Sequence, residues 1–155
     1  MPFVYSIDPT TNQTTSGTPN TEVCNLAIRQ ATRPFALTAL ALQGKGAGLT
    51  ALSGIMMQLR LWTTVGSAGT ATNPVPRDDR APAAATTGAS GTPTAGTVSG
   101  LYKLGVGCGA AGPGGWVARN GDAGIRVDGG SDELDGMSTS GTASLAYIYS
   151  AEIEE

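Results

Sequence analysis

The chain consists of short stretches of alternating apolar and polar residues, separated by loops rich in Gly, Thr, Ala and Pro. The clearest stretch runs from Gly54 to Thr64. One face carries Ile55, Met57, Leu59, Leu61 and Thr63, and the other carries Met56, Gln58, Arg60, Trp62 and Thr64. An alternation with period two predicts a β-strand with one face in a core. Gly54 and the Trp-Thr-Thr-Val end disfavour a helix.

Residues 35–42 are apolar on both faces if they alternate regularly, which predicts a strand inside a sandwich or buried in an oligomer. Shorter strands are predicted at 23–29, 98–106, 115–119, 124–128, 133–138 and 142–153. Roughly eight strands with turn residues between them indicate an all-β antiparallel sandwich or barrel.

A length of 155 residues predicts one domain. Residues 6–20 are polar, rich in turn formers and aperiodic, so we expect residues 1–21 to form an extended N-terminal arm outside the core. The sandwich domain then covers 22–155. Residues 65–96 are expected to form a long loop that carries the charged sequence Arg77-Asp78-Asp79-Arg80. Loops of this length usually carry function or are disordered.

Composition excludes several functions. The sequence has no histidine, so neither a Ser–His nor a Cys–His catalytic pair can form. The adjacent Asp78 and Asp79 are flanked by arginines, which indicates an ion-pair cluster within the loop rather than a hydrolytic pair. The net charge of −3 and the scattered cations argue against direct nucleic-acid binding. We therefore assign no catalytic residue and expect no enzyme.

Two patterns point weakly to ligands. Residues 107–112 match G-x-G-x-x-G, but Pro113 and Gly114 follow, so no helix can begin there to receive a phosphate. Acidic residues gather at Asp122, Asp128, Asp132, Glu133 and Asp135. They could attract a cation such as Ca²⁺, or they could be solvated turn residues, because their spacing matches no calcium loop. No cofactor or metal ligand is assigned.

The two cysteines, Cys24 and Cys108, lack metal-ligand spacing. Cys24 is expected to be a buried free thiol, although a single Cys24–Cys108 disulfide stays possible. The N-terminus does not have the pattern of a signal peptide, and the longest apolar stretch is too short to cross a bilayer. These features predict synthesis in a cytoplasm and no membrane partner.

Several segments resemble the small β-sandwich auxiliary, cement or decoration proteins of tailed-bacteriophage capsids. The likeness covers roughly residues 22–155 and is one of pattern, since no catalytic signature anchors it. It is carried by 56–70 (MMQLRLWTTVGSAGT), 74–78 (PVPRD), 83–86 (AAAT), 124–127 (GIRV), 144–148 (SLAYI) and 152–155 (EIEE).

The resemblance implies a jelly-roll-like sandwich on the capsid exterior that binds the major capsid protein, often as a homotrimer, after assembly in the host cytoplasm. The low charged fraction of 14% fits a protein that packs against neighbours. The residues that we assign to the interface are Trp62, Arg77, Asp78, Asp79 and Arg80. Trp62 is either part of the core or an interface anchor. The alternative function is a receptor- or glycan-binding module of a phage tail or fibre.

Overall fold

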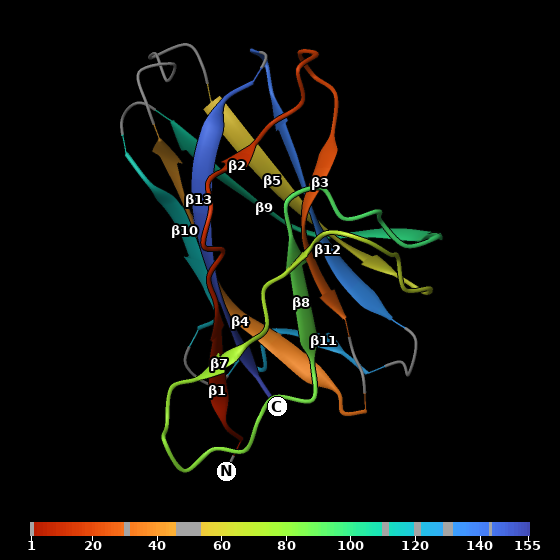
Figure 1. Ribbon diagram of the computed structural model, residues 1–155, viewed down its shortest axis with the longest axis vertical. Coiled ribbons are helices and arrows are strands. Elements are labelled where there is room, and N and C mark those ends of the chain that lie inside the picture. The colour runs from red at the N-terminus through yellow and green to blue at the C-terminus, as the bar shows by residue number, and fades with distance from the viewer. Residues whose placement is uncertain are drawn as a thin grey trace.

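A computed structural model describes residues 2–29, 32–45, 54–109, 112–119, 122–128, 132–142 and 144–155. The fold is all-β: two antiparallel sheets pack against each other as a sandwich (Figure 1). This confirms the predicted fold class. The described residues form thirteen strands rather than roughly eight, because segments expected to be an arm and a loop also contain short strands.

The first sheet, sheet A, has the order β10-β4-β13-β1-β7. Two short strands extend it, since β11 pairs with β4 beside β10, and β2 pairs with β13. The bounds are β1 Val4–Ile7, β2 Gln13–Thr14, β4 Phe35–Lys45, β7 Val75–Pro76, β10 Gly114–Val117, β11 Ile125–Val127 and β13 Ala146–Glu154.

The second sheet, sheet B, has the order β6-β8-β3-β12-β5-β9. The bounds of its strands are β3 Val23–Arg29, β5 Gly54–Trp62, β6 Thr70–Ala71, β8 Thr87–Ser90, β9 Val98–Gly109 and β12 Glu133–Ser140. The predicted strand at 54–64 therefore ends two residues earlier, and those at 98–106 and 133–138 continue further. Gly107 and Gly109, from the G-x-G-x-x-G match, belong to β9 rather than to a loop.

The core lies between the sheets and follows from the alternation of each strand. Every second residue of β13 is buried from Tyr147 to Ile153, and Ile55, Met57 and Leu59 of β5 are buried opposite. Two hydroxyl groups in this layer share one acceptor, whereas the buried Tyr149 hydroxyl has no hydrogen-bond partner among the described residues. The Tyr147 hydroxyl donates to Asn25 Oδ1 at 2.9 Å, and the Ser138 hydroxyl donates to the same oxygen. A paired polar group avoids the cost of burial without a partner.

Strand β4 is not apolar on both faces, which corrects the prediction for residues 35–42. Phe35, Leu37, Leu40 and Leu42 all point into the core and are at most 2% exposed. The register against β13 shifts at Thr38, because Ile153 pairs with Leu37 while Glu152 pairs with Ala39. A β-bulge therefore reverses the alternation in the middle of the strand. The outer face carries small residues instead.

Residues 1–21 do not form a separate arm, because β1 is an inner strand of sheet A. It pairs with β13 from Val4–Glu154 to Ile7–Ala151, and Tyr5 and Ile7 are fully buried in the core. Gln13 is also buried, and its Oε1 accepts the backbone N–H of Gly91 at 2.7 Å. Four residues of alternation are too few to stand out beside the polar sequence that follows.

The segment 65–96 is also more ordered than a loop. Strand β7 pairs with β1 at the edge of sheet A, where Pro76 lacks an N–H that an inner strand would need. Strand β8 pairs with β3 and buries Gly88, Ala89 and Ser90 in sheet B. The two chain ends lie together at one end of the sandwich (Figure 1), with Phe3 and Glu155 exchanging backbone hydrogen bonds of 3.1 Å.

The long strands are connected in a nested order. The chain passes from sheet A (β1) to B (β3), A (β4), B (β5, then β9), A (β10 and β11), B (β12) and A (β13). The first strand, β1, pairs with the last, β13, and β3 pairs with β12. Further inside this nested order, β4 pairs with β10 and β11, and β5 pairs with β9. The sheets form when β13 then pairs with β4, and β12 with β5.

Candidate interaction surfaces

The charged sequence after β7 forms an exposed ion pair within one turn. Arg80 donates from Nε and Nη2 to the two carboxylate oxygens of Asp78 at 3.0 and 2.8 Å, and its backbone N–H donates to Oδ1 at 2.9 Å. These hydrogen bonds lower the pKa of Asp78. Arg77 instead reaches β13, with Nη2 2.5 Å from Glu152 Oε1. The predicted ion-pair cluster is confirmed for Asp78 and Arg80. The ion pair of Arg77 with Glu152 connects the turn to β13 of sheet A.

Trp62 lies far from this turn. It ends β5, the yellow strand that points to the right in Figure 1, whereas the charged turn is at the lower left. Trp62 is only 7% exposed but belongs to the face of sheet B that points away from the core, because Ile55, Met57 and Leu59 occupy the inner face. The five predicted interface residues therefore do not form one surface, and Trp62 is buried within its own chain.

The centre of the outer face of sheet A is a candidate docking surface, because its residues are mostly small and uncharged and Glu152 lies only at its border, beside Ala39. Across β10 and β4, Val117 lies beside Ala39 and Gly115 lies beside Ala41. Across β4 and β13, Ala41 lies beside Ser150. Val117 is 70% exposed. We call this surface, including Gln43 and Ile148, the sheet A face. An uncharged, flat, accessible face costs little to desolvate, so it suits contact with another protein.

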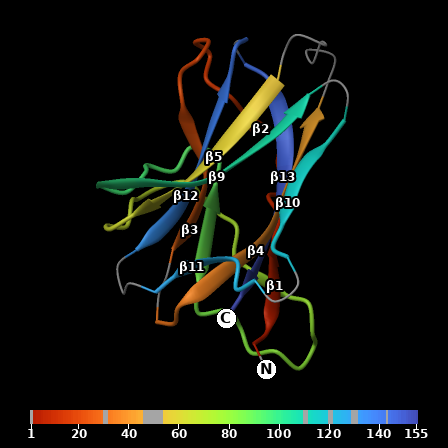
Figure 2. The same cartoon turned by 180° about the vertical axis from the view of Figure 1, so that it is seen from behind.

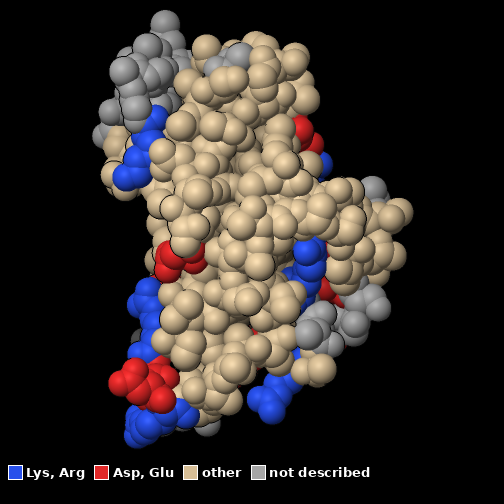
Figure 3. All heavy atoms as spheres, viewed as in Figure 1, with Lys and Arg blue, Asp and Glu red and all other residues tan. Residues whose placement is uncertain are grey.

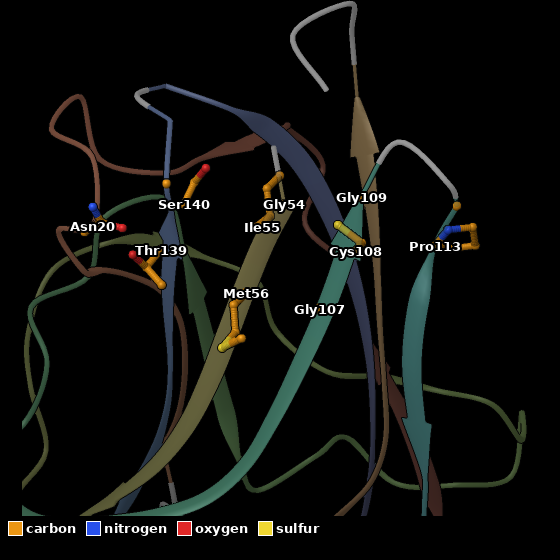
Figure 4. Close-up of a pocket in the computed structure, with 12 residues that line it drawn as sticks. Asn20, Gly54, Ile55, Met56, Gly107, Cys108, Gly109, Pro113, Thr139 and Ser140 are labelled. Carbon is orange, nitrogen blue, oxygen red and sulfur yellow. The ribbon is translucent and has the colours of Figure 1, made fainter. Parts of the chain in front are cut away.

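A groove of about 570 Å³ lies on the outer side of sheet B near the upper end of the molecule (Figure 4). Met56 projects from β5 between Gly107 of β9 and Thr139 of β12, and Asn20 lies at the far side of β12. Its lining contains no charged residue. Glycines leave the backbone of β5 and β9 accessible, and Met56 is 48% exposed. The groove can hold a neutral group.

The groove offers no reactive group. Cys108, which contributes to its lining, is 8% exposed, and burial raises the pKa of its thiol. Burial also raises the pKa of Cys24, where the nearby Asp135 and Glu133 act in the same direction. Both cysteines are free, so the Cys24–Cys108 disulfide is not formed. A buried thiol with a raised pKa is a poor nucleophile.

The acidic residues that are close in sequence do not form one cluster in space. Asp128 is exposed and pairs with Arg126 at 3.1 Å, and Asp122 Oδ1 accepts the backbone N–H of Gly124 at 3.2 Å within a turn. Glu133 and Asp135, in contrast, are fully buried. Within the described ranges, no three His, Cys, Asp or Glu side chains gather so that they could hold a metal ion. The cluster does not support a calcium site.

The buried carboxyls of Glu133 and Asp135 are a feature that the sequence did not reveal. Alternation places both on the outer face of β12, where solvated acids are ordinary. They are buried because a flap, defined here as residues 64–69 and 93–97, crosses this face. The Thr94 N–H donates to Ser67 O at 2.7 Å, and the Thr97 N–H donates to Thr64 Oγ1 at 2.6 Å. No periodicity in the flap sequence indicates this role.

Comparison with models of protein families, with curated proteins and with solved structures found no match to this chain. Among the described residues, no helix is long and apolar enough to cross a membrane.

Proposed function

We propose that this protein is a virion structural protein: a capsid cement or decoration protein of a tailed bacteriophage that binds and stabilises the assembled head. The observation that carries the proposal is the strand order, which supports a jelly-roll arrangement of the sandwich. Jelly rolls occur in viral capsid proteins and in lectin domains. The resemblance of segments 56–70 and 144–148 to capsid cement proteins favours the first of these two classes.

The jelly-roll assignment follows from numbering the main strands one to eight as β1, β3, β4, β5, β9, β10 with β11, β12 and β13. The pairs are then one with eight, two with seven, three with six, and four with five. The sheets have the orders one-eight-three-six and two-seven-four-five. This is a long antiparallel hairpin rolled up on itself, which produces two Greek keys.

The accessible surfaces suit a protein that packs against neighbours. The centre of the sheet A face is uncharged, with the Arg77–Glu152 ion pair at its border, and Figure 3 shows that charged atoms occupy little of the visible side of the molecule. A stable interface buries about 800 Å² on each partner, an area comparable with one face of a small sheet. The proposed partners are the major capsid protein and, within a homotrimer, further copies of this chain.

The mechanism is mass action. A protein that binds only the assembled shell stabilises that shell by the free energy of binding at each occupied site. Many equivalent sites then resist disassembly together. The exposed turn at Asp78 and Arg80 belongs to the rim of such a contact, where charges steer association and fix orientation more than they add affinity.

The groove on sheet B favours the alternative of a receptor- or glycan-binding module of a tail or fibre. Lectins share the jelly-roll architecture, and a groove of about 570 Å³ is large enough for a sugar residue. Among the described residues that line the groove, none has an aromatic side chain on which a sugar ring could stack. For this reason we rank the alternative second.

The test is peptide mass spectrometry of purified virus particles from the source culture, with this chain quantified against the major shell protein. Abundance of the same order as the shell protein is the expected result for a cement protein. A few copies in each particle would move the protein to the tail or fibres. If the chain were missing from the particles, the virion proposal would be wrong.

A further inference from the structure

The flap over sheet B is held at both limbs by the two buried carboxyls of β12. The backbone N–H of Gly66 donates to Glu133 Oε2 at 3.2 Å, and the backbone N–H of Gly96 donates to Asp135 Oδ2 at 3.3 Å. Both glycines are needed for this approach. A Cβ on Gly66 would lie 1.8 Å from Thr94 O, and one on Gly96 would lie 1.8 Å from Thr64 O. Each of the two flap segments, 64–69 and 93–97, is therefore bound to one buried acid.

The positive charge at this site is supplied by Arg29 of β3. Its Nε lies 2.5 Å from Glu133 Oε2, and its Nη1 donates to Ala68 O of the flap at 3.5 Å. The next cation, Arg60 of β5, is opposite Asp135 in the register but pairs with Glu22 and Gln58. The remaining titratable neighbour is the Cys24 thiol. One cation thus faces two buried acids.

Four polar atoms around this site are buried without a hydrogen-bond partner in the described part of the chain: the donors Arg29 Nη2 and Trp62 Nε1 and the acceptors Glu133 Oε1 and Asp135 Oδ1. Glu133 Oε1 and Asp135 Oδ1 are buried and have no N–H or O–H partner if both carboxyls are ionised. Two buried negative charges with one cation would be unstable, because each uncompensated ion in the interior costs several kcal/mol. A single proton bound by this pair of acids cancels the second charge, and the protonated acid becomes a donor where Glu133 Oε1 and Asp135 Oδ1 both lack a partner.

We propose that Glu133 and Asp135 form a proton-dependent latch: while they share one proton the flap is closed over sheet B, and loss of that proton releases it. Release exposes Trp62, which lies opposite Glu133 in the register and against Gly96 of the flap. The latch is independent of the proposed virion function, since it concerns only contacts within this chain.

The direction of the pH dependence follows from the proton balance. Desolvation, followed by the hydrogen bond to Glu133 and the charge of Glu133, raises the pKa of Asp135 to about 9 in the closed form. With the flap open, the solvated carboxyl ionises near its ordinary pKa of about 3.9. Between these two pKa values the closed form holds one more proton than the open form. The equilibrium constant for flap closure therefore falls about tenfold for each unit by which the pH rises.

The test uses acrylamide quenching of Trp62 fluorescence between pH 5 and 9.5 in EDTA, with Trp116→Phe as background so that Trp62 is the sole reporter. The expected result is quenching that increases several-fold toward pH 9.5 in a chain that keeps its β-sheet circular dichroism. Asp135→Asn, which mimics the protonated acid, is expected to stay closed across the range. Asp128→Asn, an exposed acid, is the matched control and keeps the wild-type profile.

Two results would overturn the latch: a flat quenching profile in the parent, or an unchanged profile in Asp135→Asn. If Asp135→Asn does not fold, the parent protein still decides the question through carboxyl ¹³C NMR of labelled aspartate and glutamate. The proposal requires one carboxyl signal, or one shared between an aspartate and a glutamate, at the protonated position at pH 7. If all aspartate and glutamate carboxyls were ionised at that pH, no shared proton would exist and the latch would be refuted.

Discussion

Truncation of Trp62 distinguishes between the two roles that the sequence left open. The side chain is 7% exposed, and a tryptophan buries roughly 200 Å². At about 25 cal/mol per Å², this burial contributes about 5 kcal/mol as an upper bound. Measured tryptophan-to-alanine costs in cores are about 3–5 kcal/mol. Because one wall of this site is the flap, which can collapse into the space, we expect about 3 kcal/mol for Trp62→Ala.

The assay is equilibrium unfolding in urea, followed by circular dichroism so that the loss of tryptophan does not affect the signal. With a slope of about 2 kcal/mol/M, a loss of about 3 kcal/mol lowers the midpoint by about 1.5 M. Val75→Ala is the control, since Val75 is 60% exposed and should change stability by less than about 0.5 kcal/mol. If Trp62→Ala had the same urea midpoint as Val75→Ala but had lost self-association, Trp62 would be an interface anchor and our argument would fail.

Three further variants or measurements test the buried and exposed parts separately. Arg29→Met leaves Glu133 buried without its cation and should cost roughly 3–5 kcal/mol in urea unfolding, whereas Arg126→Met in an exposed pair should cost less than about 1 kcal/mol. Val117→Glu on the sheet A face should leave the melting temperature nearly unchanged and abolish self-association in sedimentation; normal association would remove this face from the interface. The two buried thiols should react with Ellman's reagent only after unfolding, and fast reaction of the native protein would contradict their burial.

The sequence predicted the fold where alternation was long and regular. Strands β5 and β13 have nine residues each with an uninterrupted inner row, and both were predicted as strands, although the prediction ended β5 two residues late and began β13 four residues early. Prediction failed where the row was short or interrupted. Strand β1 has only four residues, and the bulge at Thr38 made β4 look apolar on both faces. A bulge adds one residue without any distinctive side chain, so alternation alone cannot detect it.

The sites were harder to predict than the strands, because they depend on which segments cross a sheet face. Arg80 and Asp78 are two residues apart, and their ion pair follows from local geometry alone. The burial of Glu133 and Asp135 depends on two flap segments more than 35 residues away in the chain, made mostly of Gly, Thr and Ala with Val65, Ser67 and Pro93. A segment with such small side chains has no periodic pattern, yet small side chains are what allow its backbone to approach two carboxyls.

The distribution of charge over the surfaces has a consequence for how binding should respond to salt. Among the described residues, the centres of the sheet A face and of the groove on sheet B lack charged side chains, while exposed ion pairs lie at Asp78–Arg80, Arg77–Glu152 and Arg126–Asp128. Screening weakens contacts between exposed charges but not the burial of uncharged surface. Binding through either neutral surface should therefore keep its affinity as ionic strength rises, and only its association rate should fall if the charged turn steers the encounter. A loss of affinity in salt would instead move the interface to the charged turn.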